Sequence, residues 1–178
     1  MKQLFIVVIA IVVIIGAFLI YIYSGSYNIS AMVPHNGLTL WIINTVTDNS
    51  IEHHAKDIKA PNLMDSSLIQ TGFNHYRMMC VGCHGAPGRD QGRMAKGYYP
   101  KPPLLVEAVK DWKAPELFWI VKNGIKMTAM PAYGRTHSDE EIWAITAFIQ
   151  KLPGMTKEQF QALNDAANKG RNEFMNWR

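Results

Sequence analysis

The sequence predicts a helical protein, because its hydrophobic residues recur at helical spacing wherever they form a regular pattern. One uninterrupted apolar run extends from Leu4 to Tyr23. Three later segments, residues 66–79, 114–122 and 138–152, place apolar side chains three or four positions apart. Between the first two of these segments, glycine and proline are too frequent for regular structure. We therefore expect a long N-terminal helix followed by a helical domain that a long loop interrupts.

The N-terminal run of twenty residues from Leu4 to Tyr23 carries no charge, and at helical rise it is long enough to span a bilayer. Lys2 precedes the run and the next lysine or arginine is Lys56, so the charge bias places the N-terminus in the cytoplasm. A cleaved signal peptide is the alternative, but its apolar part is about seven to fifteen residues long and ends at a small-x-small site. Residues 24–26, Ser-Gly-Ser, fit that site poorly. We predict a single-pass anchor over residues 1–24 in a bacterial cytoplasmic (inner) membrane, with the rest of the chain outside.

Residues 25–65 are expected to form a connecting region with short helices. An apolar stretch at residues 38–46 contains Trp41, and a helix beginning at Ser50 would end before Pro61. Trp41 could lie at the membrane surface or pack on the domain that follows. The sequence leaves both placements open.

Residues 66–79 are predicted to form the first helix of the domain. Its regularly spaced residues lie near one face: Leu68, Gly72, Tyr76 and Met79. Glycine weakens a helix, so a close contact with another helix would explain Gly72. This helix delivers its C-terminal end to Cys80.

The chain's only two cysteines belong to the run Cys80-Val81-Gly82-Cys83-His84, a C-x-x-C-H motif. This motif is the attachment signature of a c-type haem, in which each thiol adds to one vinyl group and the histidine lies beneath the ring as an iron ligand. A structural zinc site would need further ligands, and a thioredoxin-like dithiol would need a βαβ context. An inert cysteine pair would leave a later Met-Pro pair unexplained. The sequence therefore predicts one covalent haem c on the outer side of the membrane.

Two further elements complete the predicted domain. Residues 85–103 form the loop, which can wrap one haem edge and supply an acceptor for the ring N–H of the ligating histidine. The last helix, residues 138–152, begins at Ser138, and Glu141 three positions later completes a capping box.

The sixth iron ligand is expected within residues 125–134, which follow the helix-ending Gly124. A neutral thioether suits low-spin iron, and proline restricts the preceding residue to extended geometry. Met130, which precedes Pro131, should therefore present its sulfur from a stiff, non-helical strap. Met127 is the rival ligand.

Residues 154–178 form a C-terminal tail in which a helix is expected from Thr156 to Ala167. This helix is expected to pack on the domain or on a partner. The apolar residues of the tail include Phe160, Leu163, Phe174 and Trp177. Disorder at the extreme end is the equal alternative.

Residues 66–153, about half of the chain, resemble a class I cytochrome c domain of the membrane-anchored monohaem bacterial type. The matching features are Gly72 and Tyr76, the Cys80–Gly85 run, Pro102-Pro103-Leu104, Gly124, Met130-Pro131-Ala132-Tyr133 and the helix with Trp143. The resemblance implies an all-α fold with crossing first and last helices and thioether links from Cys80 and Cys83. It also implies His84 and Met130 as axial ligands, with the Pro103 carbonyl accepting from the His84 ring.

The same resemblance implies a carrier of single electrons between respiratory or periplasmic redox proteins, either free or as a subunit of a respiratory complex. No catalytic residue and no small-molecule substrate are expected. A haem enzyme or gas sensor with a displaceable sixth ligand is the alternative. A third hypothesis is a structural subunit whose haem mainly stabilises assembly.

The segment from Arg77 to Arg135 is basic, with ten lysines and arginines against four acidic residues. Such a surface around a haem edge would steer an acidic redox partner and make its association sensitive to salt. A merely solvated surface is the alternative. Nucleic-acid binding is not expected of an exported, membrane-tethered chain, despite its formal net charge of +4.

Overall fold

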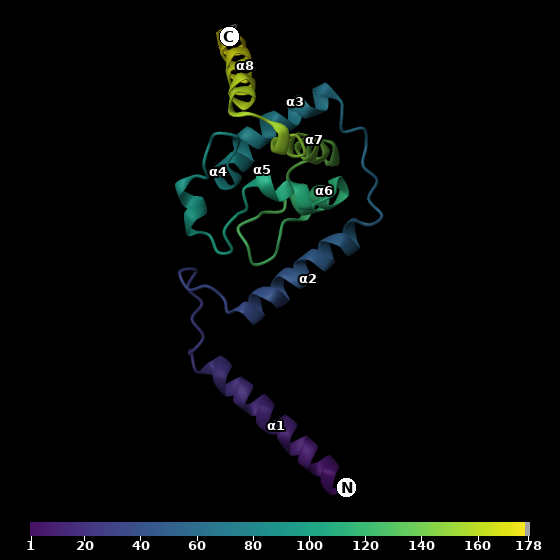
Figure 1. The fold of residues 1–178 in the computed structure, drawn as a ribbon, viewed down its shortest axis with the longest axis vertical. Coiled ribbons are helices and arrows are strands. Elements are labelled where there is room, and N and C mark those ends of the chain that lie inside the picture. The colour runs from purple at the N-terminus through teal and green to yellow at the C-terminus, as the bar shows by residue number, and fades with distance from the viewer. Residues whose placement is uncertain (177–178) are drawn as a thin grey trace. The chain divides into compact units, whose positions relative to one another are not determined.

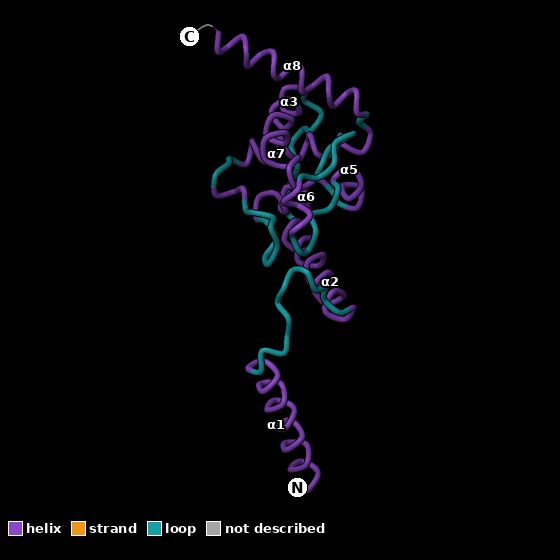
Figure 2. Tube along the Cα trace, turned by 90° about the vertical axis from the view of Figure 1, so that its left-hand side faces the viewer, coloured by secondary structure: helices purple, strands orange, loops and turns teal. Residues whose placement is uncertain are grey.

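The computed structural model describes the backbone of residues 1–176 and the side chains as far as Lys169. The chain divides into two compact units, Met1–Pro34 and His35–Arg178, which are treated separately below. In the described part, regular structure is helical, and the one β-type contact is an isolated bridge between Ala86 and Arg89 (Figure 2). The predicted all-α fold is confirmed.

The first unit consists of helix α1 (Lys2–Tyr23) and the segment that follows it. No residue of α1 is buried, and its most apolar 18-residue window has a mean hydropathy of 3.3. The Ser24 backbone N–H ends the helix by donating to the Ile20 carbonyl oxygen, at 2.9 Å. The length and composition of α1 fit a membrane span, and a signal sequence would share both properties.

The second unit begins with helix α2 (Gly37–Ala55), which is one continuous element of 19 residues. Its first turn is capped by the Asn36 side chain, which accepts from the Thr39 N–H at 2.9 Å. The sequence pattern predicts short helices here, with one starting at Ser50. The Asn36 cap and the absence of proline from Gly37 to Ala55 allow a single helix instead.

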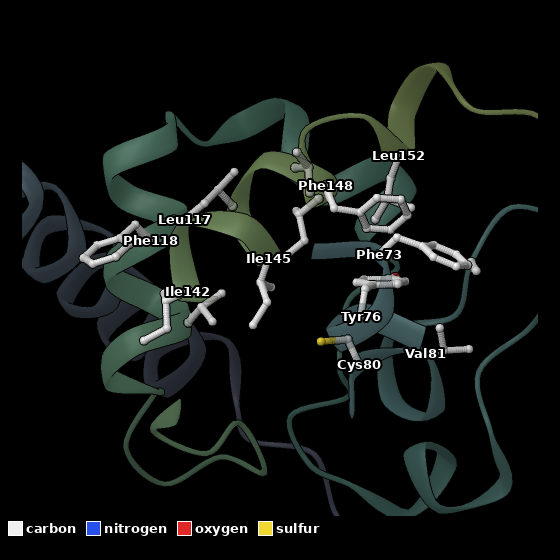
Figure 3. Close-up of a cluster of buried hydrophobic side chains, with 14 of the residues drawn as sticks. Phe73, Tyr76, Cys80, Val81, Leu117, Phe118, Ile142, Ile145, Phe148 and Leu152 are labelled. Atoms are coloured by element: carbon white, nitrogen blue, oxygen red, sulfur yellow. The ribbon is translucent and has the colours of Figure 1, made fainter. Parts of the chain in front are cut away.

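Helices α3 (Ser66–His75) and α7 (Asp139–Ile149) cross at the centre of the second unit (Figure 1). A β-carbon on Gly72 would overlap the Ala144 carbonyl oxygen and lie 2.9 Å from Phe148 Cβ. The close contact predicted at Gly72 is therefore present. Beside the crossing, the rings of Phe73 and Phe148 pack edge to face with centroids 5.4 Å apart (Figure 3).

The chain leaves α3 through a π-helical turn (Tyr76–Cys80), followed by the short helix α4 (Val81–His84). The fully buried Tyr76 donates its hydroxyl hydrogen bond to the Gly85 carbonyl oxygen at 2.6 Å. Gly85 has a φ of +68°, which a glycine adopts without strain. This bond joins the start of the π-helical turn to the end of α4, so it fixes the intervening C-x-x-C-H residues.

Helix α6 (Ala114–Asn123) packs on α7. The Phe118 and Trp143 rings stack between them with centroids 4.1 Å apart. At the start of α7, Ser138 Oγ accepts from the Glu141 N–H at 3.3 Å, and Glu141 Oε2 accepts from the Ser138 N–H at 2.8 Å. The predicted capping box is confirmed.

Two remaining helices flank this core: α5 (Leu105–Ala108) and α8 (Lys157–Asn176). The α8 backbone extends beyond the expected end at Ala167, and its Phe160 is buried against Phe73. The beginning of the tail thus packs on α3. The Phe174 side chain and Trp177 lie outside the described part of the chain.

Candidate functional site

An apolar cavity of about 290 Å³ lies in the second unit, next to the C-x-x-C-H motif. Every segment singled out by the sequence analysis as a haem contact reaches it. Its lining includes Cys80, Cys83, His84, Pro102, Pro103, Met130 and Tyr133, together with aliphatic residues of α6 and α7. Buried, mainly apolar walls with a few polar groups are typical of a cofactor site.

The two cysteines are free thiols, and both line the cavity. Cys80 is 7% exposed, and its sulfur points away from the Val81 side chain (Figure 3). Burial, with a smaller effect of the neighbouring Cys83, raises the pKa of the Cys80 thiol to about 12. Two unpaired thiols at this spacing fit thioether attachment of a porphyrin that carries two vinyl groups.

The orientation of His84 is set by the loop that follows the motif. Its Nδ1 lies 2.8 Å from the Pro103 carbonyl oxygen. A carbonyl oxygen only accepts, so Nδ1 must carry the proton and Nε2 keeps its lone pair for a metal. Burial lowers the pKa of His84, and the bond to Pro103 opposes that effect. Both the tautomer and the neutral state therefore suit an iron ligand.

The Met130 segment reaches the cavity from a separate part of the chain. Thr128 Oγ1 accepts from the Met130 N–H at 3.0 Å and donates to the Ile125 carbonyl oxygen at 2.8 Å. These bonds fix the backbone before Pro131, and Met130 lies on the cavity wall, partly buried. Met127 is 94% exposed and is not a lining residue.

Met79 is a second methionine on the cavity wall. It belongs to the same helical turn as Cys80, on the segment that also carries His84. A haem bound by Cys80, Cys83 and His84 would already be held by that segment, whereas Met130 reaches the cavity from a separate part of the chain. Of the two lining methionines, the geometry therefore favours Met130 over Met79.

Comparison with known proteins agrees with this site. Residues 67–149 match the family described as cytochrome C oxidase, cbb3-type, subunit III. Cytochrome c-553 of Nitratidesulfovibrio vulgaris (strain DSM 19637 / Miyazaki F) is 38% identical over 80 residues, which cover 41% of this chain and 69% of that protein. The chain belongs to the class I c-type cytochromes. The cytochrome is thus an electron-transfer protein with covalently bound haem c.

One residue that positions the site of the cytochrome, Gln91, is not predictable from the sequence pattern. The Gln91 side-chain amide donates to the Cys83 carbonyl oxygen at 2.8 Å and to the Pro102 carbonyl oxygen at 2.6 Å. Gln91 therefore connects the haem motif to the part of the loop that contains Pro102 and Pro103. A lone glutamine in a glycine-rich loop gives no periodic signal, so only the folded loop reveals its role.

The basic residues of the cytochrome lie mostly at its surface. Eight of those between Arg77 and Arg135 are exposed: Arg89, Arg93, Lys96, Lys101, Lys110, Lys113, Lys126 and Arg135. Lys122 is paired with Asp139, its Nζ 2.8 Å from one carboxylate oxygen, and Lys113 lies 3.6 Å from Glu116. Lys101 also lines the haem cavity, so positive charge extends to the edge of the site.

Proposed function

We propose that this protein is a membrane-anchored monohaem cytochrome that carries single electrons and catalyses no reaction of its own. Cys80 and Cys83 would hold the haem through thioether bonds, and His84 and Met130 would bind its iron. The observation that carries the proposal is the placement of His84, with Nε2 free, and Met130 on one apolar cavity. Bound haem supplies a one-electron couple at iron, and a Met/His pair raises its reduction potential.

The chain's own residues favour transfer over catalysis. Two protein ligands would fill both axial positions and leave none for a substrate or gas. The apolar lining excludes water, and the bonds from Thr128 and Gln91 hold both ligand-bearing loops. A rigid, dry site changes little when the iron changes charge, which suits rapid electron exchange.

We assign the chain to four regions. Residues 1–24 are the transmembrane anchor, residues 25–65 the connecting region, residues 66–153 the haem domain and residues 154–178 the tail. The uncharged run from Leu4 to Tyr23 and the preceding Lys2 support an anchor in the inner membrane of a bacterium, with the haem domain on the periplasmic or outer side. Edman sequencing or intact mass of the membrane-extracted protein separates a retained anchor from a cleaved signal sequence.

The partners we propose are membrane-bound or periplasmic redox proteins. The matched family is described as a subunit of an oxidase, which supports a place in a respiratory complex. The exposed basic residues favour an acidic partner surface. Extraction in mild detergent, followed by identification of co-purifying proteins, tests a permanent complex. For a transient partner, the electron-transfer rate should fall as salt is added.

The ligand assignment is tested by comparing Met130→Ala with Met127→Ala in the full-length haem protein. Met130→Ala should open the sixth position, so the ferrous form should bind carbon monoxide rapidly and the reduction potential should fall. Met127→Ala should match the unaltered protein, which we expect to remain low-spin and bind carbon monoxide poorly. Rapid carbon monoxide binding by the unaltered protein would instead support the haem enzyme or gas sensor.

A further inference from the structure

Helix α2 contributes to the haem cavity although it lies outside residues 67–149, the part that matches the cytochrome family. Its Thr47, Asp48 and Ile51 line the same cavity as Cys83 and Met130. Part of the cavity wall therefore comes from outside the family-matched residues.

The packing of the C-terminal half of α2 fixes these residues in place. Ile51 is 1% exposed and Ala55 is 2% exposed. The His54 ring stacks on the Trp119 indole of α6, with centroids 5.5 Å apart. Asp48 lies about one helical turn before Ile51, on the same side of α2. Asp48 is exposed and Ile51 is buried, so Asp48 forms the outer edge of this cavity wall and Ile51 its inner part.

We propose that α2 is part of the haem-binding site, with Ile51 against the ring and Asp48 at its edge, and that the two residues adjust the reduction potential in opposite directions. This inference rests on the haem site proposed above. A carboxylate near the ring stabilises the ferric form, which carries one more positive charge, so Asp48 lowers the potential. Ile51 excludes water and makes the ferric charge costlier, so it raises the potential.

Charge and burial are tested with separate pairs of variants in the full-length protein, by potentiometric titration at low salt. Asp48→Asn should shift the reduction potential upward. Its control is Glu52→Gln. Glu52 lies one turn after Asp48 on α2 and also carries a carboxylate, but it does not line the cavity. Ile51→Ala should shift the potential downward, whereas Ile43→Ala, at an exposed position of the same helix, should not.

Two outcomes would overturn this assignment: equal potentials for Asp48→Asn and Glu52→Gln, or an upward shift for Ile51→Ala. The Asp48→Asn comparison stands even if Ile51→Ala is too unstable to purify, because Asp48 is exposed. Failure of the underlying haem site is distinguishable, since the unaltered protein would then lack covalent haem on a denaturing gel.

A second, independent observation concerns the N-terminal half of α2. From Gln3 to Thr47 the sequence contains no aspartate, glutamate, lysine or arginine. Within α2, four large apolar residues recur along one exposed side: Leu38, Trp41, Ile42 and Val46. Trp41 is 64% exposed. Its side chain is therefore not packed on the haem domain, which was one of the two placements left open by the sequence.

We infer that this side of α2 lies in the headgroup region of the membrane that α1 enters. Residues 24–36, which join the two helices, reach at most about 45 Å when extended, at roughly 3.5 Å per residue. A linker of this length allows the apolar side to contact the bilayer surface, and tryptophan favours the bilayer interface. Because residues 3–47 include no aspartate, glutamate, lysine or arginine, no charge has to leave water when this side contacts lipid. Like the anchor, this inference depends on retention of α1.

Photo-crosslinking in native membranes tests whether lipid contacts this side of α2. Benzoylphenylalanine in place of Trp41 should form lipid adducts, whereas the same group in place of Glu52, three turns further along α2, should form far fewer. A protein adduct at position 41 would identify a partner subunit there instead. Equal lipid labelling at both positions would also overturn the inference. Loss of α1 is recognised separately, from the mass of the purified chain.

Discussion

Gly124 lies directly against the backbone of Met130: a β-carbon on Gly124 would come within 2.7 Å of the Met130 carbonyl oxygen. The same carbonyl oxygen accepts a hydrogen bond from the Ile125 N–H at 3.3 Å. The beginning and the end of the strap are therefore in contact. This closure holds Met130 at the cavity, and it requires a residue without a side chain at position 124.

Gly124→Ala should weaken both the fold and methionine ligation. Gly124 has a φ of +66°, and alanine in a left-handed conformation costs more than about 1 kcal/mol, to which the overlap with Met130 adds. We expect a lower free energy of unfolding and faster carbon monoxide binding by the ferrous form. Gly97→Ala is the control, because a β-carbon there meets no atom within 4 Å. Equal effects of the two substitutions would show that the strap does not depend on Gly124.

Features encoded by neighbouring residues were predictable from the sequence. The capping box at Ser138 depends on a residue three positions away, and Gly72 reveals its role because glycine is unfavourable inside a helix. The choice of Met130 over Met127 follows from the local effect of Pro131, and the structure places Met130 on the cavity.

Features that depend on distant contacts were not predictable. The C-terminal half of α2 is held by packing on α6, about 65 residues later in the sequence, and the hydrophobic pattern of α2 alone does not indicate that contact. Its N-terminal half keeps apolar residues exposed, which disguises the usual amphipathic signal. The role of Gln91 was not predictable for the same reason, because the two carbonyl oxygens to which it donates lie on different stretches of backbone.

Tyr76→Phe should destabilise the π-helical turn (Tyr76–Cys80) that leads into the C-x-x-C-H motif. It removes the buried hydroxyl that donates to the Gly85 carbonyl oxygen at 2.6 Å, and leaving a buried carbonyl without its donor costs about 1–3 kcal/mol. Chemical denaturation of the holoprotein measures the loss. Tyr98→Phe is a suitable control, because Tyr98 is only half-buried and its hydroxyl has no hydrogen bond in the described part of the chain. A loss no larger than in this control would contradict the role given to the bond.

Stability should fall in acid partly through Glu141. The hydrogen bond from the Ser138 N–H holds the pKa of the Glu141 carboxyl below its usual value, with smaller contributions that include His75 and His137. Because the folded-state pKa is depressed, this contribution is fully present above the unfolded pKa of about 4.3. It is lost as pH falls through the lower folded-state value.

The acid limb of the stability curve checks this expectation. Glu141→Gln cannot change charge, so its melting temperature should fall less steeply below about pH 4.5 than that of the unaltered protein. Glu140→Gln removes a carboxylate from the same helical turn but leaves the capping pair intact, so most of the slope should remain. If both variants flattened the curve equally, the effect would come from overall charge and not from the cap.

Gln91→Ala should disturb the orientation of His84 without touching it. The substitution removes the donor to the Cys83 and Pro102 carbonyl oxygens, and each unpaired carbonyl can cost about 1–3 kcal/mol if water does not replace the donor. Because Pro102 precedes the residue that accepts from His84 Nδ1, the imidazole should gain rotational freedom. We expect a lower free energy of unfolding and a broadened low-spin ferric electron paramagnetic resonance spectrum. Gln150→Ala, at an exposed position, should change neither, and an unchanged spectrum for Gln91→Ala would mean that the loop holds Pro103 without this side chain.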